Sequence, residues 1–128
     1  MEPLPPPDPG RWRAHPAAPE PGTALAPLAE IKDGDAREFR FGKRGAFSMF
    51  VVRRGDAVRA YVNICPHFGT PLNDRAPTFL TEDGTRIRCT THFSEYRIED
   101  GFGVAGHGEG CWLDPVPVAV EDGLIVLR

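Results

Sequence analysis

Two short stretches constrain this chain more than any other feature, because each places a cysteine close to a histidine. They are Cys65-Pro66-His67 and Cys89-Thr90-Thr91-His92. Each stretch offers one thiolate and one imidazole to a single metal centre, and together they use two of three cysteines and two of four histidines. Soft thiolates suit iron in a sulfide cluster, whereas neutral imidazoles suit a second, less electron-rich iron. The fold must therefore hold two loops face to face.

The residues after each half make the pattern more specific. The first half continues as Cys65-Pro66-His67-Phe68-Gly69-Thr70-Pro71-Leu72, and the second as Cys89-Thr90-Thr91-His92-Phe93-Ser94-Glu95-Tyr96. These two stretches resemble the cluster loops of Rieske proteins. The resemblance covers roughly residues 28–128, because the closing segment 115–126 is similar to the final strand pair of small soluble Rieske-type ferredoxins.

The resemblance implies a ligand set and a cofactor. It places one Rieske-type [2Fe–2S] cluster in the chain, with Cys65 and Cys89 on the inner iron and His67 and His92 on the outer iron. The cysteines then point toward the core and the imidazoles reach the surface, where a redox partner can dock. Imidazoles in place of two thiolates raise the reduction potential above that of four-cysteine ferredoxins, and the potential should fall as their protons are lost with rising pH.

Two hydroxyl groups near the second loop are expected to adjust the potential. Ser94 and Tyr96 match positions whose hydroxyls donate hydrogen bonds to sulfur in high-potential Rieske proteins. Such a donor stabilises the extra electron of the reduced state. The disulfide of respiratory Rieske proteins is absent, since Thr70 and Thr91 occupy the corresponding positions. We therefore expect an intermediate potential, within the Rieske span of roughly −150 to +300 mV rather than at its lower edge.

The loops carry three further signals. Gly69 and Pro71 are expected to shape the first loop, since glycine permits a close backbone approach and proline rigidifies. Phe93 replaces the glycine that is usual after the histidine of the second loop. Cys111 is left over and is interpreted as a partly buried thiol. The polar stretch 73–84 is interpreted as an insertion in the connection between the loops.

The chain divides into a tail and one domain. Residues 1–27 hold nine of the fourteen prolines and predict a disordered, polyproline-like tail. The resemblance implies that residues 28–128 form a Rieske domain, and short β signals alternate there with turns such as Arg54-Gly55-Asp56 and Asp122-Gly123. The glycine-rich stretch 103–110 predicts a mobile loop. Because no stretch has sustained helical periodicity, we expect an all-β antiparallel sandwich or barrel with a two-loop cluster-binding subdomain.

Charge and hydropathy exclude several classes of function. A net charge of −3 disfavours nucleic-acid binding, and no apolar run is long enough to span a bilayer. The N-terminus also lacks a basic-then-apolar secretory pattern. We therefore expect a cytoplasmic protein without membrane or nucleic-acid partners; as a free electron shuttle, it should also be a monomer.

Four functional alternatives remain open at this stage. The first is a free ferredoxin that carries single electrons between a reductase and a terminal oxidoreductase such as an oxygenase. The others are a permanently docked electron-transfer subunit, a structural zinc module and a redox sensor. Zinc fingers favour a different order and spacing of ligands. Catalysis by the chain alone is not expected, because only His15 and His107 remain for a mononuclear iron site.

Overall fold

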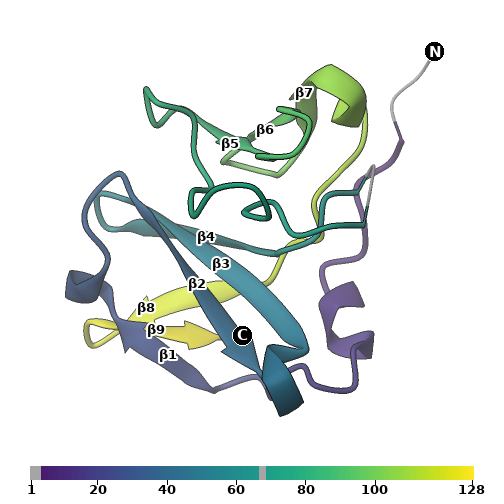
Figure 1. Ribbon diagram of the computed structural model, residues 1–128. Helices are drawn as coiled ribbons and strands as arrows, with labels where there is room; N and C mark the ends of the chain where they lie inside the picture. The colour runs from purple at the N-terminus through teal and green to yellow at the C-terminus, as the bar shows by residue number, and fades with distance from the viewer. Residues whose placement is uncertain (1–3, 67–68) are drawn as a thin grey trace.

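The fold consists of short antiparallel strands. The computed structural model describes residues 4–66 and 69–128, and within them nine strands form three open sheets of three strands each, with four 3-10 turns and no α-helix (Figure 1). In spatial order the sheets are β1 (Ala24–Pro27), β9 (Leu124–Leu127) and β8 (Val118–Glu121), then β2 (Ala36–Phe41), β3 (Phe47–Arg54) and β4 (Ala57–Val62), then β5 (Arg86–Arg88), β6 (Glu95–Arg97) and β7 (Gly103–Ala105). This confirms the all-β antiparallel fold, with open sheets in place of a closed barrel across the described residues.

The middle sheet is buried on both faces because β3 is apolar in consecutive positions. Met49 and Val51 point into a core shared with β1 and β9, whereas Phe50 and Val52 point into a second core beneath β5 and β6. Successive side chains of a strand point to opposite faces, so a continuous apolar run serves two cores. The middle sheet thus supports the third sheet, which packs above it (Figure 1).

The N-terminal segment differs from the disordered tail expected for residues 1–27, as far as its described residues show. A 3-10 turn at Arg11–Ala14 buries Trp12, which is 3% exposed and lies 6.2 Å from Phe47 between ring centroids. Strand β1 also lies within this segment and pairs with β9. Trp12 supplies enough apolar surface to hold the proline-rich segment against the domain.

The glycine-rich stretch 103–110 is not the mobile loop that its composition predicts. It forms β7 and a 3-10 turn at Gly106–Gly108 that packs on β6. A Cβ atom on Gly103 would lie 1.9 Å from the carbonyl oxygen of Gly108, and one on Gly108 would lie 2.2 Å from the Tyr96 hydroxyl. The glycines therefore allow the chain to approach itself closely around β6.

The connection 73–84 is also packed rather than loose. Phe79 is buried and stacks on Phe50 with 4.5 Å between ring centroids. The Arg88 N–H donates to the Phe79 carbonyl, which ties this connection to β5. No helix in residues 4–66 or 69–128 is long and apolar enough to cross a membrane.

Candidate metal centre

The two cysteine loops each follow the end of a strand and share one backbone pattern. In the first loop, the Cys65 N–H donates to the Thr70 carbonyl and the Cys65 carbonyl accepts from the Gly69 N–H, each at 2.7 Å. In the second loop, the Cys89 N–H donates to the carbonyl of the residue five positions later, and its carbonyl accepts from the residue four positions later. The first loop follows β4, and the second follows β5. Two unrelated sequences thus fold into equivalent turns.

The equivalence explains the conformation of Phe93. Gly69 and Phe93 each lie four residues after their cysteine, and both have positive φ, at 74° and 60°. A bulky residue rarely adopts this left-handed region. Glycine adopts the positive φ of Gly69 readily, and its role in shaping the loop stays a prediction. Phe93 keeps the glycine-like backbone, although its ring is 63% exposed.

The two thiols lie in the core, and the second-loop imidazole lies at the surface. Cys65 and Cys89 are both 0% exposed and unpaired, and they interact with each other. Burial raises the pKa of Cys89, while N–H groups of Thr91 and His92 directed at its sulfur lower it. His92 is exposed. His67, the fourth expected ligand, lies outside the described residues, and within these no three His, Cys, Asp or Glu side chains form a metal-binding group.

Two orphaned hydroxyls test whether these residues fit the expected cluster. Thr70 Oγ1 and Thr91 Oγ1 are buried, and neither has a hydrogen-bond partner among the described residues. Buried hydroxyls without partners are rare in folded proteins. Both lie in the cysteine loops, where sulfide and thiolate sulfurs would accept hydrogen bonds. The soft donors and the unsatisfied hydroxyls therefore fit an iron–sulfur cluster.

Tyr96 places its hydroxyl beside a thiol. It lies on β6 with 0% exposure, and its Oη lies 3.6 Å from Cys65 Sγ. Burial raises the pKa of Tyr96, and the neighbouring Cys65 raises it further, so the hydroxyl keeps its proton. Ser94 Oγ accepts a hydrogen bond from the Gly108 N–H at 2.9 Å and also contacts the Tyr96 hydroxyl. A protonated phenol can donate only to an acceptor, which a metal-bound thiolate would be.

Four further residues lie around the two loops, and two of them, His107 and Ile64, have no clear signal in the sequence. His107 packs edge-on to His92, with 6.2 Å between ring centroids. Cys111 is half-buried and lines a small pocket with Pro66 and Trp112. Ile64, directly before Cys65, is 47% exposed. Pro71, expected to shape the first loop, is exposed at its far side.

A family match covers most of the chain. Residues 23–111 match the model of the Rieske [2Fe-2S] domain, a family whose members bind a [2Fe–2S] cluster. The chain therefore belongs to the Rieske [2Fe–2S] domain family. Among curated protein sequences, none matches this chain.

Solved structures agree on the fold. The ferredoxin of carbazole 1,9a-dioxygenase from Nocardioides aromaticivorans IC177 is 22% identical, with a TM-score of 0.69 over 85% of this chain and 98% of that one. The Sphingomonas yanoikuyae B1 ferredoxin is 24% identical, with a TM-score of 0.63 over 84% and 97%. A chain in the complex of reduced oxygenase and oxidized ferredoxin of carbazole 1,9a-dioxygenase is 22% identical, with a TM-score of 0.66 over 83% and 91%.

Proposed function

We propose that this chain is a one-electron carrier that passes electrons between a reductase and a terminal oxidoreductase such as an oxygenase. Cys65 and Cys89 would hold one iron of the cluster, and His67 and His92 the other. The observation that carries this proposal is the pair of buried, unpaired thiols on two loops of equivalent geometry. When bound, the cluster supplies a one-electron couple whose potential depends on its surroundings.

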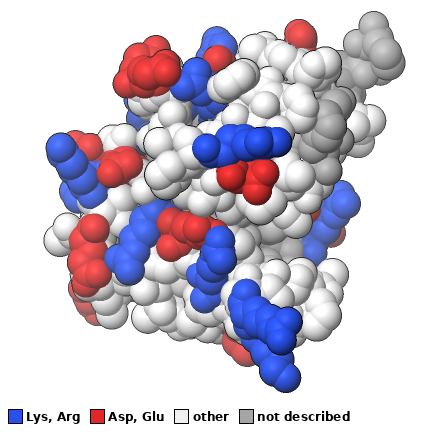
Figure 2. All heavy atoms as spheres, in the orientation of Figure 1, with Lys and Arg blue, Asp and Glu red and all other residues white. Residues whose placement is uncertain are grey.

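Exposed apolar side chains beside the two loops support docking at this end of the molecule. Ile64 precedes the first cysteine, and Phe93 follows His92. A bulky residue held in the left-handed region, at a cost of about 1–3 kcal/mol, suggests a functional reason for its retention. Figure 2 shows acidic and basic side chains interspersed over one face, so no single-sign field covers that face. Apolar contact through Ile64 and Phe93 would then contribute to partner affinity.

An oxygenase-type partner is supported by the structural relatives. The Nocardioides relative is the ferredoxin of a dioxygenase, and another similar chain comes from a complex of an oxygenase with its ferredoxin. Transfer of this role to the present chain rests on the shared fold and the equivalent loops. We infer that the chain acts as a ferredoxin component.

An anaerobic reductive titration tests the carrier role. The purified protein would be titrated with dithionite while its visible absorption is followed, and then reoxidised with cytochrome c as a one-electron acceptor. We expect the uptake of about one electron per chain and its full return to the acceptor, because the cluster has a one-electron couple. A chain that takes up no electrons, or that cannot return them, contradicts the proposed function.

A further inference from the structure

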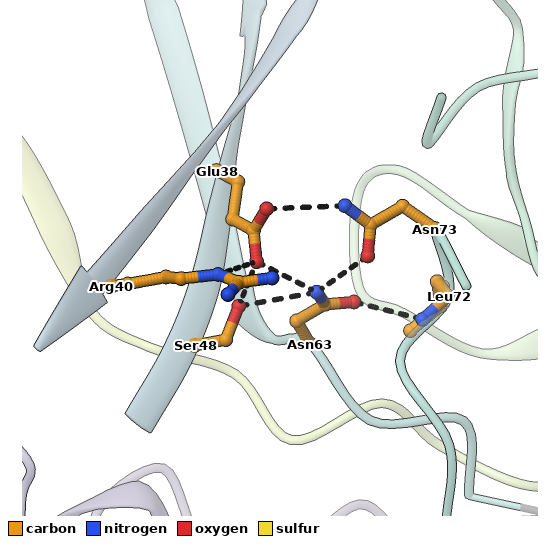
Figure 3. A network of polar contacts seen from close by, with 6 residues as sticks. All are labelled: Glu38, Arg40, Ser48, Asn63, Leu72 and Asn73. Carbon is orange, nitrogen blue, oxygen red and sulfur yellow. Dashed lines mark hydrogen bonds and ion pairs between the residues drawn. The ribbon is translucent and has the colours of Figure 1, made fainter. Parts of the chain in front are cut away.

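Asn63 is a buried polar residue at the foot of the first cysteine loop. It directly follows β4, precedes Cys65 by two residues and is 2% exposed. Its Oδ1 accepts a hydrogen bond from the Leu72 N–H at 2.8 Å, and Leu72 lies at the other foot of the loop. The Asn63 side chain therefore ties together the two ends of the first cysteine loop (Figure 3).

The backbone of Leu72 extends this connection to the second loop. Its carbonyl accepts from the Thr90 N–H at 2.8 Å and from Thr90 Oγ1 at 2.7 Å. Thr90 directly follows Cys89, so the backbone of a single residue, Leu72, joins the Asn63 amide to the second cysteine loop. One short chain of hydrogen bonds thus connects the two cysteine loops.

The middle sheet holds the other end of the Asn63 amide. Its Nδ2 donates to Asn73 Oδ1 at 2.9 Å, to Ser48 Oγ at 3.1 Å and to Glu38 Oε2 at 3.3 Å (Figure 3). Glu38 also accepts from Ser48 Oγ, from Arg40 Nε and from Asn73 Nδ2. Burial raises the pKa of Glu38, but the hydrogen bonds from Ser48, Arg40 and Asn73 more than offset this and hold the pKa below its ordinary value.

This arrangement allows one orientation of the Asn63 amide. An ionised carboxylate only accepts hydrogen bonds, and the Leu72 N–H only donates, so Nδ2 must face Glu38 and Oδ1 must face Leu72. A loop that faced solvent on both sides would not require such a directional contact. The network therefore defines the register of the first loop against the middle sheet as well as its span.

We propose that Asn63, oriented by Glu38 and Ser48, is a positioning residue that sets how the two cysteine loops face each other. This inference rests on the proposed function, because its consequence is the geometry offered to the cluster. Among the described residues, no hydrogen bond joins the Asn63 side chain to a candidate ligand. Asn63 therefore acts through its hydrogen bond with the Leu72 backbone. Outer residues of this kind typically change metal affinity by about 10–100-fold when they are replaced.

Asn63→Asp is the most direct test, because it keeps the shape and the acceptor for Leu72 but sets a second carboxylate against Glu38. We expect iron release to a chelator to become at least about tenfold faster, and the electron paramagnetic resonance signal of the reduced protein to broaden. Adding Glu38→Gln restores a donor opposite the new carboxylate, so the double variant should recover part of both losses.

Three controls separate positioning from general destabilisation. Glu30→Gln makes the same chemical change as Glu38→Gln at an exposed carboxylate that pairs with Arg37, and it should leave iron release and the resonance signal unchanged. Val51→Ala weakens the core far from the loops and should lower the thermal midpoint without broadening the signal. Ser48→Ala removes one contact of Asn63 and serves if Asn63→Asp does not fold, with a smaller effect in the same direction.

Two results would overturn the inference. One is an Asn63→Asp protein whose iron release and resonance signal stay within about twofold of the parent, which is well below the change typical of such residues. The other is a change that Val51→Ala reproduces at equal loss of stability. A parent protein that binds no iron and gives no signal contradicts the proposed function instead, so the two failures are distinguishable.

Discussion

Tyr96→Phe tests how the protein adjusts the potential of its centre. The substitution removes one oxygen atom from a fully buried ring and keeps the ring itself. The lost group lies 3.6 Å from Cys65 Sγ and stays protonated, because burial and the neighbouring Cys65 raise the Tyr96 pKa. A donor to a ligand sulfur is worth more when an added electron makes that sulfur more negative. Its removal should therefore lower the reduction potential.

The size of the shift follows from one hydrogen bond. A neutral hydrogen bond contributes about 1 kcal/mol and a charge-assisted one about 2 kcal/mol, so the two redox states differ by about 1 kcal/mol. For a one-electron couple, about 1.4 kcal/mol corresponds to 59 mV. We therefore expect Tyr96→Phe to lower the potential by about 40 mV.

The assay is a redox titration of the parent and two variants. Tyr61→Phe is the matched control, because its hydroxyl is also buried but donates to the Ile98 carbonyl at 2.5 Å and not to sulfur. It should destabilise the fold by about 1–3 kcal/mol through the unsatisfied carbonyl and leave the potential unchanged. Equal shifts in Tyr96→Phe and Tyr61→Phe, or none in Tyr96→Phe, would refute the reasoning.

Three further substitutions test the fold around the site. Glu38→Gln should lower the free energy of unfolding at neutral pH. In urea unfolding its difference from the parent should narrow in acid, because the folded-state pKa of Glu38 lies below its unfolded value, so the contribution is present above the unfolded pKa and is lost as pH falls through the folded one. A difference that stays constant with pH would contradict this. Phe93→Gly should raise the free energy of unfolding by up to about 1 kcal/mol, because relief of the left-handed backbone strain at Phe93 exceeds the entropy cost of glycine. A marked loss of stability would instead show that the phenylalanine ring packs against the domain. Trp12→Ala should lower the free energy of unfolding by about 3–5 kcal/mol, because a large buried side chain is lost. Trp12→Phe should lower it much less, because the buried indole N–H has no partner among the described residues. Thermal midpoints equal to that of the parent would mean that the N-terminal segment does not contribute to the core.

Much of the β architecture could be predicted from local patterns. The alternation in Arg37–Phe41 and the apolar run after Ala46 correspond to β2 and β3, and the turn at residues 54–56 joins β3 to β4. Asp122 and Gly123 both have positive φ in the last hairpin, as a tight two-residue turn requires. The cluster and the family also follow from the paired cysteine loops. The ligand assignment itself stays a prediction.

The features that escaped prediction depend on contacts between distant residues. Strand β7 lies in a glycine-rich stretch with few side chains to indicate a strand, and its Gly103 is explained by the close approach of the Gly108 carbonyl. Trp12 stands among prolines, and its partner Phe47 lies far along the chain. Asn63 is one polar residue after a strand, and its contacts reach Glu38 from 25 positions away. Local sequence patterns carry no information on such pairs.

The central claim is that Cys65, His67, Cys89 and His92 hold a [2Fe–2S] cluster that carries one electron. The most direct measurement is electron paramagnetic resonance of the purified protein before and after anaerobic reduction, with iron and acid-labile sulfide measured on the same sample. We predict a silent oxidised state, a rhombic spin-half signal after reduction, and about two irons and two sulfides per chain. Bound zinc without sulfide and without a signal would contradict the claim.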